Sequence, residues 1–174
     1  NSSGTTNGDV WSFSTTYKAP TGFLADNDKI YEGDNANLRW YSVGSSCDGY
    51  NIYCNGTKVN NSLITGTTYS LSGLTYNMSG YSITATAVYG NVESGHSIPE
   101  IVYVSGKANV SGKLFEIDGF TPISGGQIDF VGTDEFGSLQ SCTINVNNNG
   151  LYSGDVYVGT YTATASIKEV TGEN

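Results

Sequence analysis

Hydrophobic and polar residues alternate with a period of two along most of this chain. The pattern is clearest in residues 80–89, where five apolar residues occupy every second position: Tyr81, Ile83, Ala85, Ala87 and Tyr89. Because successive side chains of a β-strand point to opposite faces, this stretch predicts a strand with one face in a core and the other toward water. We expect it to be the central strand of an antiparallel sandwich.

Shorter stretches with the same alternation flank this strand. Between residues 17 and 104 the turn signals recur about every eight to twelve residues, which is the spacing typical of a β-sandwich. One of the predicted strands places Trp40 in the core. The dipeptide Asn55-Gly56 has the positive-φ preference of a tight hairpin turn. The polar and acidic segment 26–35 is predicted to be a loop.

The pattern changes from Gly106 onward. Glycine-rich turns now separate shorter alternating stretches, and the last of these carries three residues on one side: Tyr161, Ala163 and Ala165. We expect a second unit here, joined to the first by a short link at residues 105–109.

Composition supports an all-β fold. The 174 residues include 23 glycines, 13 tyrosines and 3 prolines, together with many Ser, Thr and Asn residues. Val, Ile, Thr and Tyr favour strands, whereas Gly and Asn favour the turns between them. No extended segment has the apolar spacing of an amphipathic helix. The predicted fold class is therefore all-β, with two tandem small antiparallel β-sandwiches.

The net charge excludes two classes of partner. Seven basic residues against sixteen acidic ones give a formal charge of −9 at pH 7. A field of this sign repels phosphate backbones and anionic lipid, so we expect no nucleic-acid binding and no direct insertion into a membrane. The sequence contains no signal peptide and no membrane-spanning run. Its abrupt ends favour a piece of a longer protein.

A set of residues at the predicted strands and turns of the first unit forms a known pattern: Pro20, Leu38, Trp40, Tyr50, Ile52, Tyr53, Asn55, Gly56, Thr68, Tyr69, Leu74 and the alternating stretch 81–89. The pattern resembles a fibronectin type III domain, an immunoglobulin-like sandwich. Leu74 followed by Tyr81 is similar to the leucine-to-tyrosine corner of that family. Modules of this subtype are found beside peptidases and adhesins on bacterial surfaces. The integrin-binding Arg-Gly-Asp loop of the family is absent.

Four glycine-rich signatures follow one another in the second unit: Val110-Ser111-Gly112, Pro122-Ile123-Ser124-Gly125, Asn149-Gly150-x-Tyr152 and Gly159-Thr160-Tyr161. Their order and spacing resemble the carboxypeptidase regulatory-like family, a small transthyretin-like (prealbumin-like) sandwich. The glycines have a structural reason, because tight turns between short strands need left-handed backbone. These signatures carry no chemistry. The usual final strand of the family lies past Asn174, so this unit is expected to be truncated.

The first sixteen residues stand apart from both units. The run Gly8-x-Val10-Trp11-Ser12-Phe13 is similar to the closing strand of immunoglobulin-like modules in bacterial surface proteins. We therefore divide the chain into residues 1–16, the tail of a preceding module or a linker, residues 17–105, a fibronectin type III-like sandwich, and residues 106–174, a carboxypeptidase regulatory-like sandwich.

Candidates for catalysis are few. His96 is the only histidine and lies in a predicted loop. No segment resembles a nucleophile elbow or an activated cysteine. The three cysteines, Cys47, Cys54 and Cys142, have no zinc-ligand spacing and are expected to be buried thiols that act as small hydrophobes. We predict that the segment is not an enzyme and needs no cofactor.

Four carboxylates are close enough in sequence to suggest calcium: Asp26, Asp28, Glu32 and Asp34. The helix–loop–helix calcium pattern requires an oxygen ligand where Ile30 stands. The alternatives are a plain acidic loop, which we favour, and a weak cation site of irregular geometry.

Tyrosines on outward or loop positions are the best candidates for a binding surface: Tyr31, Tyr41, Tyr53 and Tyr76. Flat rings of this kind stack on sugars or anchor a protein partner. The alternative is that they only cover the edges and corners of the sandwich.

These observations favour a non-catalytic spacer that presents the neighbouring domains of a larger secreted or cell-surface bacterial protein. A second hypothesis is an adhesin module that binds glycan or a host protein through its exposed tyrosines. A third, an accessory region of a secreted peptidase, rests on family resemblance alone. The expected location is extracellular or at the cell surface.

Overall fold

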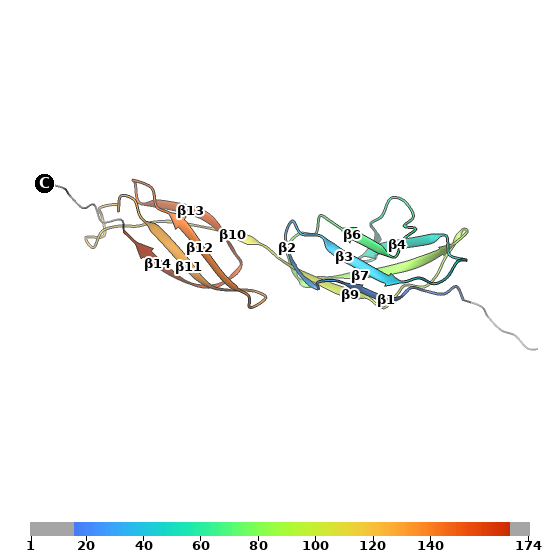
Figure 1. The fold of residues 1–174 in the computed structure, drawn as a ribbon. Helices are drawn as coiled ribbons and strands as arrows, with labels where there is room; N and C mark the ends of the chain where they lie inside the picture. Colours follow the sequence, from blue (N-terminus) through green and yellow to red (C-terminus); the bar gives the residue numbers. More distant parts are fainter. Residues whose placement is uncertain (1–15, 168–174) are drawn as a thin grey trace, which may run out of the picture.

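The computed structural model describes residues 16–167, and the fold is described for this part of the chain. It is an elongated body of two β-sandwiches arranged end to end (Figure 1). Residues 16–167 contain strands, turns and irregular segments but no helix, and consequently no helix able to span a membrane. The all-β prediction with two tandem sandwiches is confirmed. Apart from Thr16, the predicted tail 1–16 lies outside the described residues.

The first sandwich consists of two sheets. One sheet has the order β1–β3–β6: Thr21–Ala25, Ala36–Tyr41 and Thr68–Leu71. The other has the order β2–β9–β7–β4–β5, with β8 paired to β7: Lys29–Tyr31, Glu100–Ser105, Asn77–Tyr89, Gly49–Cys54, Thr57–Lys58 and Val92–Glu93. Strand β7 lies in the middle of this larger sheet, which confirms the central strand expected from its alternation.

The core of the first sandwich lies between these sheets. Its fully buried side chains include Leu38, Ile52 and Ile83, and Trp40 packs there with its ring centroid 5.3 Å from that of Tyr50. Each comes from a strand whose alternate residues are polar or small, so one face of each sheet supplies the core. The predicted turn is also present, because Asn55 and Gly56 have φ values of 48° and 79°.

The prediction that residues 26–35 form a loop is wrong in part. Residues Lys29–Tyr31 form strand β2, which pairs in parallel with the end of β9. The sequence shows no alternation there because the strand is short and lies at the edge of its sheet. Ile30 is its one buried residue. The pairing of β2 with β9 is the one parallel pairing in residues 16–167, and the other strand pairings there are antiparallel as expected.

The second sandwich is smaller. Its sheets are β10–β13, Lys107–Lys113 with Leu151–Tyr157, and β12–β11–β14, Leu139–Asn145 with Gln127–Asp134 and Gly159–Ser166. Few hydrophobic side chains are buried between them: Ile123, Ile128, Ile144, Val146 and Val156. Strand β13 packs closely over β12: a Cβ added to Gly154 of β13 would lie only 2.9 Å from the Cδ1 atom of Ile144 in β12.

The link between the sandwiches is shorter than the predicted segment 105–109. Strand β9 ends at Ser105 and β10 begins at Lys107, so Gly106 alone separates them. The thiols also differ from the expectation. Cys47, Cys54 and Cys142 are free and half-buried rather than buried. Burial is still enough to raise the pKa of the Cys54 thiol.

Candidate functional site

The two sandwiches meet at a joint built around Tyr31 and Asp134. Tyr31 ends β2, and the parallel register places it beside Ser105, the last residue of β9. Its hydroxyl donates a hydrogen bond of 2.5 Å to a carboxylate oxygen of Asp134, at the end of β11 in the other sandwich. The short strand that the sequence did not predict thus carries the side chain that crosses between the sandwiches.

The carboxylate of Asp134 is 4% exposed but fully satisfied. Its second oxygen accepts backbone N–H bonds of 2.9 Å from Phe136 and Ser138, and Gln140 donates to the first at 2.8 Å. Burial by itself raises the pKa of Asp134, but these hydrogen bonds and that from Tyr31 outweigh it and hold the pKa below its usual range. The same hydrogen bond to Asp134, followed by burial, raises the pKa of Tyr31.

Aromatic contacts surround this hydrogen bond. The ring of Tyr31 lies 4.5 Å, centroid to centroid, from that of Tyr157 and 5.6 Å from that of Phe136, both in the second sandwich. The Nζ atom of Lys29 lies 5.8 Å from the centroid of Phe136. Contacts of this kind contribute about 0.5–1.5 kcal/mol each beyond the area that they bury.

A second set of contacts centres on Glu135. Its carboxylate accepts hydrogen bonds from the hydroxyls of Tyr76, at 2.7 Å, and Ser105, at 3.0 Å, both in the first sandwich. The backbone N–H of Tyr76 donates to Glu32 at 2.6 Å. A Cβ at Gly106 would lie 2.7 Å from Oε2 of the same Glu32 carboxylate, so a side chain at the linking position would have to displace that carboxylate.

The four predicted binding tyrosines do not form one surface. Tyr31 and Tyr76 both lie at the joint, where their hydroxyls bond Asp134 and Glu135. Tyr53 donates its hydroxyl to Glu93 at 2.8 Å, away from the joint. Tyr41 lies on β3 and is 72% exposed. A hollow of about 290 Å³ adjoins Tyr41 and is lined by Gly22, Leu24, Arg39, Trp40, Thr67 and Thr68.

The surroundings of Tyr53 form a polar cluster on β4, β7 and β8. Glu93 accepts hydrogen bonds from Tyr53, from Thr86 at 2.8 Å and from the Asn51 amide. Burial by itself raises the pKa of Glu93. These hydrogen bonds lower the pKa by more than burial raises it, so the net shift is downward. The rings of His96 and Tyr53 form a T-shaped pair with centroids 4.8 Å apart, and Nδ1 of His96 is 2.8 Å from the hydroxyl of Thr84. Through these hydrogen bonds to Glu93, the cluster connects β8 to β4 and β7.

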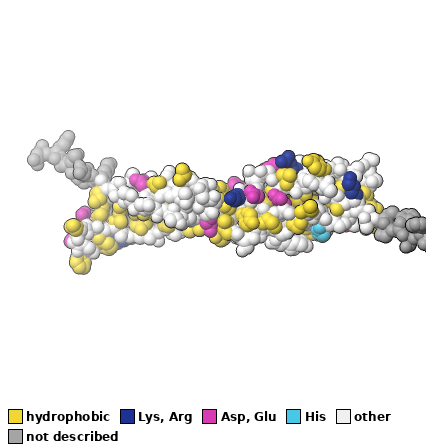
Figure 2. Space-filling view, turned by 90° about the horizontal axis from the view of Figure 1, so that it is seen from below, with side chains coloured by type: hydrophobic (Ala, Val, Ile, Leu, Met, Phe, Trp, Pro, Cys, Tyr) yellow, Lys and Arg dark blue, Asp and Glu magenta, His cyan; other side chains and the backbone are white. Residues whose placement is uncertain are grey.

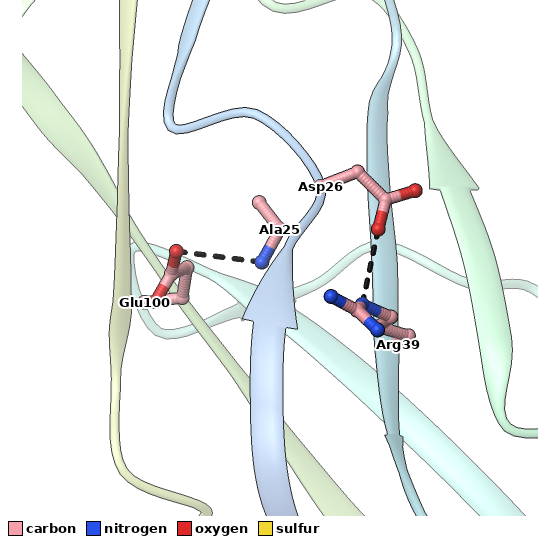
Figure 3. Close-up of polar contacts among 4 residues, drawn as sticks. All are labelled: Ala25, Asp26, Arg39 and Glu100. Atoms are coloured by element: carbon pink, nitrogen blue, oxygen red, sulfur yellow. Dashed lines mark hydrogen bonds and ion pairs between the residues drawn. The ribbon is translucent and has the colours of Figure 1, made fainter.

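The predicted acidic segment divides its carboxylates among different partners. Asp26 forms an ion pair of 3.1 Å with Arg39 of the neighbouring strand β3 (Figure 3). Asp34 accepts the backbone N–H of Tyr31 at 3.1 Å, and Glu32 accepts that of Tyr76. Asp28 contributes its backbone carbonyl, which accepts from Tyr103. Residues 16–167 contain no group of three or more metal-ligating side chains, so the structure does not bring these four together as a cation site.

Sequence reasoning missed the second-sandwich half of the joint, namely Asp134, Glu135, Phe136 and Tyr157. The available signal was the turn Asp134-Glu135-Phe136-Gly137 between two alternating stretches, with two carboxylates and an aromatic ring at one end of a sandwich. Figure 2 shows acidic side chains gathered around the junction between the two sandwiches.

No family model matches this chain, and no curated protein matches it. Among solved structures it is similar to SGBP-B of the Bacteroides ovatus mixed-linkage glucan utilization locus, in complex with a mixed-linkage heptasaccharide. The identity is 11% and the TM-score 0.30, over 84% of this chain and 52% of the other. The chain thus spans about half the length of that protein. A likeness at this TM-score carries no argument about function.

Proposed function

We propose that this chain is a non-catalytic, rigid two-sandwich segment of a larger secreted or cell-surface bacterial protein, which holds the neighbouring domains at a fixed distance and orientation. The observation that carries this proposal is the hydrogen bond from Tyr31 to the buried Asp134, together with the packing of the Tyr31 ring against the rings of Phe136 and Tyr157. A loose tether between two domains has no need of a buried, fully satisfied carboxylate at the connection.

The length of the connection supports the same proposal. Flexible linkers act through several freely rotating residues, whereas here Gly106 alone lies between β9 and β10. The hydrogen bond from Val158 N–H to the Gly106 carbonyl, 3.0 Å, ties even this residue to the second sandwich. Bending at Gly106 therefore requires the loss of several contacts at once, including both hydrogen bonds to Glu135.

We further propose that the modules are fibronectin type III-like and carboxypeptidase regulatory-like. The tyrosine corner supports the first, because the hydroxyl of Tyr81 bonds the carbonyl of Thr75 upstream of it. A place beside a secreted peptidase remains a prediction from the resemblance alone.

The test is the relative orientation of the two sandwiches in solution, measured by residual dipolar couplings of backbone amides. A rigid joint gives both sandwiches the same alignment tensor. The Tyr31→Phe variant removes only the hydroxyl, which costs the joint about 1.5 kcal/mol, and its tensors should diverge. Tyr41→Phe, at an exposed ring, is the matched control. Independent tensors in the unaltered protein would overturn the proposal.

A second candidate function has one observation in its favour. The exposed ring of Tyr41 beside the hollow that contains Arg39 and Thr68 offers a stacking face next to hydrogen-bond donors, the arrangement that suits a sugar unit or a protein side chain. A glycan array and pull-downs with host proteins test it. Binding that is lost in Tyr41→Ala but kept in Tyr53→Ala would support this function, and silence in both assays would reject it.

A further inference from the structure

Strand β10 of the second sandwich has an unpaired edge. Among residues 16–167, strand β10 pairs only with β13. Hydrogen bonds join Val158 N–H to the Gly106 carbonyl and Leu114 N–H to the Gly150 carbonyl, one at each end of this pair. Both fall in the register of the pair, so the even-numbered residues of β10 exchange main-chain hydrogen bonds with β13. The N–H and C=O groups of four odd-numbered residues point to the open side: Lys107, Asn109, Ser111 and Lys113.

The face next to this edge is also uncovered. On β14, Ala163 and Ala165 pair with Phe130 and Ile128 of β11 and therefore share their inward face. Ile128 is buried and Phe130 half-buried, but both alanines are exposed. An inward residue that remains exposed shows that no strand in the described part of the chain covers it.

The arrangement of the two sheets explains this exposure. Strand β13 packs over β12. Since Ile128 of β11 is buried, the orders β13–β10 and β12–β11–β14 favour a position of β10 over β11. A cavity of about 150 Å³ between β12 and β13 is also lined by Lys107 of β10 and Tyr161 of β14. The position beside β10 and over β14 holds no strand among the described residues.

We propose that this position is a binding site for an extended strand of a partner polypeptide, which pairs with the free edge of β10 and covers β14. Main-chain hydrogen bonds supply the affinity in such strand addition, and pockets for alternate side chains supply the specificity. This site begins next to the joint, because Lys107 contacts Tyr157, but it does not depend on the proposed spacer function.

The ends of β10 indicate the charge of the partner strand. Lys107 and Lys113 lie on its outer face, six positions apart in register, and both are exposed. Their Nζ atoms lie 4.9 Å and 5.1 Å from the ring centroids of Tyr157 and Phe115. The acidic residue nearest to them across the pair, Asp155, accepts a hydrogen bond from Asn109. Carboxylates opposite the two lysines, with apolar residues at the inward positions between them, complete the site.

A second copy of this chain is a poor occupant. If two β10 strands paired antiparallel about their midpoint, Lys107 of each would lie opposite Lys113 of the other at both ends of the pair. Like charges directly opposite one another destabilise a sheet, and lysines at edges are a known protection against such self-association. The geometry therefore favours an acidic partner strand over self-pairing.

Amide hydrogen exchange of the whole chain, followed by NMR, tests the site. In the free protein we expect fast exchange at the four odd-numbered amides and slow exchange at Ala108, Val110 and Gly112, which bond to β13. The probe is the capped heptapeptide Glu-Val-Thr-Val-Thr-Val-Glu. At saturation it should slow the four open amides by about tenfold or more, and leave the amides of the first sandwich unchanged.

The charge requirement is tested with the double variant Lys107→Glu, Lys113→Glu. It should lose the acidic peptide and bind the matched Lys-Val-Thr-Val-Thr-Val-Lys peptide, while slow exchange at Val110 reports that the sandwich is folded. Protection of the open amides in the free protein would overturn the proposal: if it is independent of concentration, the chain fills the position itself, and if it grows with concentration, a second copy does. No slowing by the acidic peptide would equally reject it.

Discussion

The hydroxyl of Tyr81 donates a hydrogen bond of 3.2 Å to the carbonyl oxygen of Thr75, six residues upstream. The Oγ1 atom of Thr75 lies at the same distance from this hydroxyl. Tyr81 itself packs against the core of the first sandwich. The side chain therefore fixes the path by which the chain passes from β6 to the long central strand β7.

Replacement of Tyr81 by Phe should lower the free energy of unfolding of the first sandwich by about 1 kcal/mol, the usual net contribution of one hydrogen bond. The ring and its packing are kept, so the fold should not change. Urea unfolding followed by tyrosine and tryptophan fluorescence measures the loss. Tyr103→Phe is the control, because its hydroxyl has no hydrogen-bond partner among residues 16–167; equal losses in the two variants would contradict the prediction.

The features of the fold that follow from local pattern were predictable. The alternation from Tyr81 to Tyr89 predicted a strand with its inner face in a core, and Ile83 is in fact fully buried. The hairpin at Asn55-Gly56 followed from the conformational preference of those two residues. In both cases the information lies within about ten residues of sequence, which is the range over which periodicity and turn preference act.

The joint was not predictable for the opposite reason. Tyr31 and Asp134 are 103 positions apart, and neither carries a local signal of the other. Tyr31 was a candidate for a binding surface because it lay in a predicted loop, and β2 forms there only because the end of β9 offers it a parallel partner. Contacts between two folded bodies depend on how their ends meet, and period-two patterning says nothing about that.

The two cores should respond independently to substitution. Ile83 is 0% exposed in the first sandwich, and Ile83→Ala should destabilise that sandwich by about 3 kcal/mol through lost burial and a residual cavity. The hydrophobic core around Ile128 and Ile144 is separate, so its transition should remain within about 0.5 kcal/mol of the unaltered protein. Differential scanning calorimetry resolves the two transitions.

The exposed Val92 provides the control for this comparison, since Val92→Ala removes methyl groups without creating a cavity. A single transition that shifts as a whole in Ile83→Ala would show that the two sandwiches unfold as one unit, and the independence of the cores would be rejected.

Asn60 should contribute to stability more than its position in a loop indicates. It is buried, its Oδ1 accepts the backbone N–H of Ile52 at 2.8 Å, and its amide donates to Asn51 at 3.1 Å and to the Ser62 carbonyl at 2.9 Å. Asn60→Ala leaves the buried N–H of Ile52 without an acceptor, so we expect a loss of about 2 kcal/mol. Chemical unfolding measures it. Asn61→Ala, at the exposed neighbouring position, should cost less than about 0.5 kcal/mol.

The joint should depend on pH at both extremes. The pKa of Asp134 is lowered, so its contribution is complete above the usual aspartate pKa of about 3.9 and is lost as the pH falls through the lowered value. The pKa of Tyr31 is raised, so its contribution is complete below about 10 and is lost as the pH rises through the raised value. Between these limits the relative orientation of the sandwiches should stay constant in residual dipolar couplings.

Tyrosinate absorbance tests the coupling between the two groups directly. Because the hydrogen bond to the Asp134 carboxylate is the largest cause of the raised pKa of Tyr31, Asp134→Asn should bring the titration of this tyrosine closer to its ordinary value and remove the acid limit of the orientation profile. The carboxylates of Glu32 and Glu135 also lie at the joint, so Glu135→Gln is the necessary comparison. If Glu135→Gln moves the titration of Tyr31 as far as Asp134→Asn does, the raised pKa reflects the negative charge at the joint in general. The prediction that the hydrogen bond from Tyr31 to Asp134 causes it would then be wrong.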